Sequence, residues 1–193
     1  MSVTISESQQ DGLQELMNIS MGQAANSLAR LIEAKINLSI PEIKTLGPEG
    51  LKAICVSNDF CLTRQSFLGE IHGEVITLFS QQGLSEIGKL MSYQDADDVA
   101  QQHALLLDLA NILAGACLNG FATQLGLKTS LSMPTIMQAN QFARTELKWS
   151  DTLVMKIAFY VESLSFDAKV VICFDADSIT TALISLDRLM GIE

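Results

Sequence analysis

The chain has 193 residues, of which 48% are hydrophobic, and this length suits one well-buried core better than two. Its 22 acidic and 12 basic side chains give a formal net charge of -10, which repels nucleic acid and anionic lipid. No apolar run approaches the roughly 20 residues of a membrane helix, and the polar start of the chain lacks a signal-peptide pattern. We therefore expect one cytoplasmic domain over residues 1–193 that binds neither nucleic acid nor membrane.

The cysteines and histidines show no pattern of a metal or redox site. No two cysteines have the Cys-x-x-Cys spacing, and neither His72 nor His103 has a cysteine or a second histidine at ligand spacing. Sequence spacing does not test residues that meet only in the fold. Because free cysteine buries as readily as most aliphatic side chains, we interpret all four as small core residues: Cys55, Cys61, Cys117 and Cys173.

The first half of the chain predicts a long helix, then extended segments, then a shorter helix. The long helix is expected from about Glu7 to Ile32. The extended segments are expected near 35–45, 51–62 and 67–79, and the shorter helix near 83–91. Apolar and polar residues alternate from Ile36 to Ile40, and Pro41 follows, which indicates a strand end or an edge strand.

The second half repeats that order after the polar stretch 92–98, which suits a connector or a helix N-cap. Its long helix is expected at 99–125, its extended segments near 128–139, 152–162 and 167–174, and its closing helix at 178–190. The runs 74–79 and 169–174 are rich in β-branched and aromatic residues and nearly continuous in apolarity. These two runs predict central strands.

The two halves are related by an internal duplication, because residues 15–43 match residues 108–136 in register. The identical pairs are Leu16/Leu109, Asn18/Asn111, Ile19/Ile112, Gly22/Gly115, Asn26/Asn119, Ala29/Ala122, Lys35/Lys128, Leu38/Leu131, Ser39/Ser132, Pro41/Pro134 and Ile43/Ile136. We therefore predict an α/β, layered α+β domain with a pseudo-two-fold axis. Its halves, about 7–92 and 99–190, would share one sheet packed by the two long helices and by shorter ones.

Each long helix carries a polar stripe opposite its apolar face. On the first helix the stripe spans an arc of about 80° and comprises Asp11, Glu15, Asn18, Gly22 and Asn26. The opposed apolar set is Leu13, Leu16, Met17, Ala24, Leu28 and Leu31. On the second helix Asp108, Asn111, Gly115 and Asn119 oppose Leu106, Leu109, Ala110, Leu113, Cys117 and Phe121. In each copy a carboxylate and an amide at i and i+3 stand about 5–6 Å apart at their Cβ atoms, so both address one small target.

Gly22 and Gly115 extend the two stripes. An exposed helical glycine costs roughly 1 kcal/mol relative to alanine, so a compensating role is expected. One interpretation is a bare patch that lets the backbone of a partner approach the acid and the amide. The other is tight packing of the glycines inside this protein.

The segment Glu15-Leu-Met-Asn18-Ile-Ser-Met-Gly22, its second copy, and the strands that end at Pro41 and Pro134 resemble the CheC-type phosphatases (CheC, CheX and the phosphatase domain of FliY). The resemblance covers most of the chain and is sharpest at 11–43 and 104–136. It implies removal of phosphate from the aspartyl-phosphate of a CheY-like response regulator. Asn18 would orient the attacking water and Glu15 would pair with a lysine of the regulator. No cofactor of the chain's own is implied, because Mg²⁺ is expected in the partner.

The second copy departs from the family pattern. Asp108 replaces the expected glutamate beside Asn111, and Ala104 replaces the polar residue one turn upstream. The shorter acid loses roughly 1.5 Å of reach, so we expect the second site to be weaker than Glu15/Asn18 or vestigial. The resemblance also suggests the deamidase CheD as a partner, and two complete halves favour a monomer. The alternative is a non-catalytic binding or scaffold module similar to the middle domain of FliM, which lacks the acid and amide.

Overall fold

The structure, a computed structural model, describes residues 4–56, 59–93, 98–144, 152–161 and 163–192. Within these residues the helices are α1 (Glu7–Ile32), α2 (Pro48–Cys55), α3 (Gln81–Leu90), α4 (Val99–Gln124), α5 (Ala139–Arg144) and α6 (Ala176–Met190). The strands are β1 (Ile36–Leu38), β2 (Glu42–Leu46), β3 (Phe60–Gly69), β4 (Gly73–Ser80), β5 (Thr129–Leu131), β6 (Thr135–Met137), β7 (Thr152–Val161) and β8 (Phe166–Phe174). The same order of elements therefore occurs twice, which confirms the predicted α+β duplication.

All strands belong to one antiparallel sheet in the order β1-β7-β8-β4-β3-β5. The hairpins β3–β4 and β7–β8 meet at the centre through β4 and β8, as the apolar runs predicted. The short strands cross over, because β1 and β2 of the first half pair with β7, while β5 and β6 of the second pair with β3. Each half thus completes the sheet of the other, and the predicted edge position of Pro41 is confirmed.

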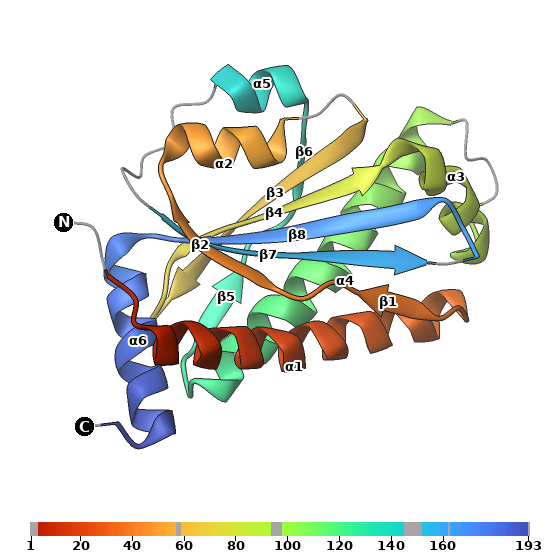
Figure 1. Cartoon of the computed structure of the whole chain (residues 1–193). Helices are drawn as coiled ribbons and strands as arrows, with labels where there is room; N and C mark the ends of the chain where they lie inside the picture. The colour runs from red at the N-terminus through yellow and green to blue at the C-terminus, as the bar shows by residue number, and fades with distance from the viewer. Residues whose placement is uncertain (1–3, 57–58, 94–97, 145–151, 162, 193) are drawn as a thin grey trace.

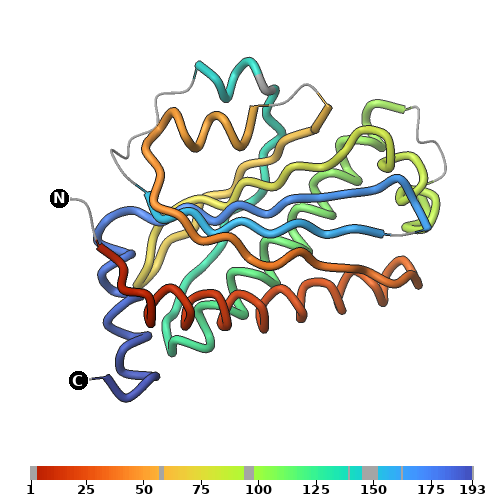
Figure 2. The backbone as a smooth tube through the Cα atoms, viewed as in Figure 1, coloured from red at the N-terminus to blue at the C-terminus, as the bar shows by residue number. Residues whose placement is uncertain are grey.

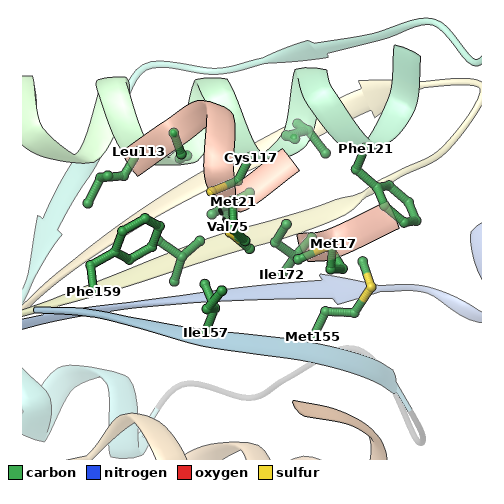
Figure 3. Packing of buried hydrophobic residues seen from close by; sticks show 14 of the residues in the cluster. Met17, Met21, Val75, Leu113, Cys117, Phe121, Met155, Ile157, Phe159 and Ile172 are labelled. Carbon is green, nitrogen blue, oxygen red and sulfur yellow. Dashed lines mark hydrogen bonds between the residues drawn. The ribbon is translucent and has the colours of Figure 1, made fainter. Parts of the chain in front are cut away.

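The helices cover both faces of the curled sheet (Figure 1). α1 and α4 pack together on one face, α2 and α5 lie on the other, and α3 and α6 lie at opposite ends. Figure 3 shows the main core between α1, α4 and the sheet, where Met21 and Cys117 of the helices meet Val75, Ile157 and Ile172 of the strands. A smaller apolar cluster lies under α2 and α5.

The two long helices begin where side chains cap them. Ser6 and Gln9 form a capping box at the start of α1, and Asp98 accepts from the Ala100 N–H at the start of α4. Both helices therefore begin as the sequence predicted. α1 and α6 meet at one end of the molecule (Figure 2), where the Gln9 amide donates to the Asp187 carboxylate.

The prediction of an extended segment over 51–62 is wrong in its first part, and α5 was not predicted. Residues 48–55 form α2, which starts with Pro48 in its first turn and buries Leu51 and Cys55, one turn apart, against the sheet. The strand begins only at Phe60. Pro48 and the i,i+4 spacing were visible start signals, but the segment is short and apolar enough to be mistaken for a strand.

Two further expectations need correction. Leu31, assigned to the core face of the first helix, has 44% of its surface exposed near the end of α1. The second long helix, Val99–Gln124, is long and apolar enough to cross a membrane by length and composition, and its most apolar 18-residue window has a mean hydropathy of 1.6. However, 56% of that window is buried inside the fold, where α4 packs against α1 and the sheet.

Candidate functional site

The structure places both acid and amide pairs on the surface. Glu15 and Asn18 are exposed on α1, and Asp108 and Asn111 are exposed on α4. They lie outward because their neighbours in each helix turn toward the sheet. Leu13, Leu16, Met17, Leu28, Leu106, Leu109, Leu113 and Phe121 are all buried. Each carboxylate therefore shares one solvent-facing stripe with its amide.

The first pair is free of internal bonds. Within the described part of the chain, neither Glu15 nor Asn18 makes a hydrogen bond or an ion pair with another residue. A solvent-facing carboxylate offers two acceptor oxygens, and an amide offers both a donor and an acceptor. Both side chains of this first site are thus available to an external partner without the loss of an internal contact.

The second pair is engaged on both sides. The Tyr93 hydroxyl donates to the Asp108 carboxylate at 2.5 Å, and the Gln65 amide donates to Oδ1 of Asn111 at 3.2 Å. The same Gln65 nitrogen donates to the Ser132 carbonyl at 3.0 Å. Because a backbone carbonyl only accepts, this bond fixes which end of the Gln65 amide faces Asn111. Asn111 is thereby held toward the sheet by its oxygen.

Burial, the hydrogen bond to Asp108 and the negative charge of that carboxylate together raise the pKa of the Tyr93 phenol to about 12. Tyr93 is therefore protonated over the ordinary range of pH and acts as a stable donor. Asp108 and Asn111 line a hollow together with Tyr93, with Leu31 at the end of α1, and with their neighbours Met91, Ser92 and Ile112. The second site thus lies in a recess, and some of its hydrogen-bonding atoms are already bonded to Tyr93 and Gln65.

The two halves differ in the sheet beneath the helices. Gln65 is 1% exposed and lies opposite the break between β5 and β6, whereas Ile157 lies opposite the matching break between β1 and β2. Ile157 has no polar group, so the first site lacks the donor that holds Asn111. Gln65 and Tyr93 were missed from sequence, because Gln65 lies between the predicted extended segments 51–62 and 67–79, whereas β3 runs unbroken through it, and Tyr93 lies in the stretch interpreted as a connector.

Gly22 and Gly115 border the two sites with bare backbone. A Cβ placed on either glycine would meet no described atom within 4 Å. The interpretation that they serve tight packing inside the protein is therefore wrong. The patch of uncovered helix beside each acid and amide remains, and it gives an approaching backbone close access.

Other polar chemistry in the described residues is structural. Among them, no group of three histidine, cysteine, aspartate or glutamate side chains is arranged to hold a metal ion. Cys55, Cys117 and Cys173 are buried, as predicted, and Cys61 is half-buried. Burial raises the pKa of each thiol, so these cysteines are poor nucleophiles. The exposed acid and amide pairs are therefore the groups best placed to act on an external molecule.

Fold and surface together define a duplicated α+β domain with an acid and amide pair displayed on each long helix. A model of the CheC-like family matches residues 9–44, which cover most of α1, all of β1 and the first part of β2. The chain is 27% identical over 141 residues to the CheY-P phosphatase CheC of Bacillus subtilis (strain 168), a match that covers 68% of this chain and 67% of that protein. The chain is therefore similar in sequence to the CheC-type family.

Solved structures show the same fold. FliY from Thermotoga maritima has a TM-score of 0.72 at 16% identity and covers 97% of this chain and 100% of its own. The FliM middle domain from H. pylori has a TM-score of 0.67 at 8% identity, covering 94% and 99%. A CheX-CheY-BeF3-Mg+2 complex from Borrelia burgdorferi gives 0.57 at 17% identity, covering 83% and 96%. At these identities the likeness establishes the architecture.

Proposed function

We propose that this protein is a phosphatase that hydrolyses the aspartyl-phosphate of a CheY-like response regulator in chemotaxis or another two-component pathway. The observation that carries the proposal is the exposed, unbonded pair Glu15 and Asn18 on α1. The Bacillus subtilis relative named CheY-P phosphatase supports the substrate class. The Borrelia burgdorferi complex of CheX with CheY supports the kind of partner. The site of action would be the cytoplasm.

The proposed reaction requires few catalytic groups from this chain. Water attacks phosphorus, the bond between phosphorus and the aspartyl oxygen breaks, and the freed carboxylate stays on the regulator. The regulator supplies Mg²⁺ and a lysine beside the phosphate, so positioning is the main remaining requirement. The Asn18 amide would accept one hydrogen bond from the water and donate another nearby, while Glu15 would pair with the lysine. We assign this chain no cofactor of its own.

The test is phosphate release from a phosphorylated receiver domain, with and without the purified protein. The wild-type protein should accelerate release, and the double variant Asn18→Ala/Asn111→Ala should not, while its circular dichroism spectrum stays unchanged. Full acceleration by the folded double variant would reject the role assigned to the amides.

We propose that Glu15/Asn18 is the principal site, because Asp108 and Asn111 are held internally. Asn111 must leave Gln65, and Asp108 must share its carboxylate with the Tyr93 hydroxyl, before either side chain reaches outward. In an Asn18→Ala background, Tyr93→Phe removes this hydroxyl and keeps the ring, and we expect the residual rate of dephosphorylation to rise. One hydrogen bond to a charged group is worth about 1.5–3 kcal/mol, so the rise should be at most roughly tenfold to a hundredfold. A lower residual rate would show that Tyr93 supports the second site.

Gly22→Ala separates stability from docking. Alanine favours the helix by roughly 0.5–1 kcal/mol over glycine, and the added methyl group meets open space in this chain. We therefore expect a higher midpoint of urea unfolding together with weaker binding of the phosphorylated regulator. Gly126→Ala would be an unsuitable comparison, because Gly126 has φ +68, a conformation that alanine rarely adopts. Gly115→Ala on α4 is the appropriate comparison, because a Cβ there also meets open space. An unchanged affinity for Gly22→Ala would exclude close approach at this patch.

A second candidate is a binding or scaffold module without catalysis, and the structural likeness to the FliM middle domain favours it. Binding of a regulator with no change in the lifetime of its phosphate would support this candidate. Contact with CheD stays a prediction.

A further inference from the structure

Ile40 and Met133 are the two most exposed large apolar side chains of the described residues, at 74% and 81%. They occupy matching positions in the two repeats, between Ser39 and Pro41 and between Ser132 and Pro134. Isolated exposed aliphatic residues are common on protein surfaces. Here the same exposure occurs at the same place in both halves, which calls for a shared cause.

Each of these residues sits in a β-bulge of an edge strand. The Ser39 N–H donates to the Ala158 carbonyl at 2.9 Å, and pairing resumes at Glu42 opposite Lys156. Ile40 and Pro41 therefore face only Ile157. A bulge of this kind bends the strand and re-aims a side chain, and bulges are frequent next to active sites.

The second edge strand has the same bulge. The Ser132 N–H donates to the Ser66 carbonyl at 2.8 Å, and pairing resumes at Thr135 opposite Arg64, so that Met133 and Pro134 face only Gln65. In both copies the serine hydroxyl accepts a backbone N–H of the neighbouring strand, from Ser66 at 2.9 Å in this copy and at 3.0 Å in the other. Proline fixes φ at the next position. The side chains of Ile40 and Met133, here called the apolar tips, are thus held rigidly outward.

Both tips lie beside the acid and amide stripes. Met133 directly follows Ser132, whose carbonyl shares the Gln65 amide with Asn111. In the first half, the Pro41 carbonyl accepts from the Gln14 amide at 3.0 Å, and Gln14 lies one helix turn before Asn18. A domain that covers Asn18 or Asn111 therefore also reaches the neighbouring tip.

We infer that Ile40 and Met133 are the apolar anchors through which a response-regulator receiver domain docks on each long helix. The inference rests on the proposed function. A protein interface needs a few buried apolar anchors beside its polar contacts, and the stripes alone supply only polar groups and bare backbone. The partner would present an apolar surface next to its phosphorylated pocket. A second copy of this chain is a poorer occupant, because two chains of net charge -10 repel each other.

The test uses the full chain with Ile40→Ser and Met133→Ser, singly and together. The measurements are the Kd for a receiver domain activated with beryllofluoride and Mg²⁺, and KM and kcat for phosphate release from the phosphorylated domain. We expect the double variant to raise Kd and KM by roughly tenfold or more, the loss typical of an interface anchor. The kcat at saturation should stay near the wild-type value, because Asn18 is intact. Ile40→Leu keeps an apolar side chain at this position and should leave Kd and KM near their wild-type values.

Ile184→Ser is the matched control, since Ile184 is an aliphatic residue on α6 that is 53% exposed and belongs to neither bulge. It should leave Kd and KM unchanged. A wild-type protein that neither binds nor dephosphorylates any receiver domain of its host would reject the proposed function. If the wild-type protein is active and the double variant binds the receiver domain with the same Kd, only the anchor role of Ile40 and Met133 is overturned. Sedimentation could instead show that the wild-type protein is a dimer and the double variant a monomer, with the same affinity for the receiver domain. That result would assign Ile40 and Met133 to contact with a second copy of the chain, and it would also overturn their role as anchors for the receiver domain.

Discussion

Replacing Asn18 with alanine is expected to lower the rate of regulator dephosphorylation roughly 10²- to 10³-fold, the usual cost of removing one positioned hydrogen-bonding group. The side chain is exposed and makes no bond within the described chain, so its loss leaves no internal group unpaired. The free energy of unfolding should therefore change by no more than about 0.5 kcal/mol. Phosphate release at saturating receiver domain, with urea unfolding in parallel, measures both quantities.

Two comparisons sharpen this result. Asn140→Ala removes another exposed amide, on α5 at the opposite face of the sheet, and should leave the rate unchanged. Asn111→Ala should cost less than Asn18→Ala, because Asn111 is bonded to Gln65. A larger loss from Asn111→Ala would reverse the proposed order of the two sites while keeping the chemistry.

Replacing Phe174 with alanine is expected to reduce the free energy of unfolding by about 3–5 kcal/mol, as for other buried aromatic residues. The ring is fully buried at the end of β8. Its centroid lies 5.6 Å from that of Phe67 on β3 and 5.6 Å from that of Phe121 on α4. The cavity would therefore open between strands of both halves and a long helix. Urea unfolding followed by circular dichroism measures the loss.

The same experiment tests whether the halves fold as one unit. Because the edge strands of each half pair with the hairpin of the other, the wild-type protein should unfold in a single transition. Phe174→Leu keeps an apolar side chain of similar size and should cost clearly less than alanine. Two separate transitions would contradict a shared core. A loss below about 1 kcal/mol for Phe174→Ala would mean that the site collapses around the missing ring.

Elements with long, regular patterns were predictable from the sequence. α1 and α4 follow from their periodicity and caps, and β4, β7 and β8 follow from runs rich in β-branched residues. α2 was not predicted, because about two turns of helix are too short to show a clear periodicity, and the segment fits a strand equally well until the neighbouring sheet buries Leu51 and Cys55. The exposure of Leu31 shows the same limit, since the next residue, Ile32, is buried while the fold leaves Leu31 at the hollow that Asp108 lines.

The sequence by itself determined the duplication and the position of each acid and amide on one helix face, because both depend on residues close together in the chain. Only the tertiary structure decided how the two pairs differ. Tyr93 follows α3 and Gln65 lies on β3, yet both bond to the site on α4, while Ile157 takes the place of Gln65 in the other half. These partners come from distant segments that the shared sheet brings together, so no local pattern in the chain encodes which pair is held and which is free.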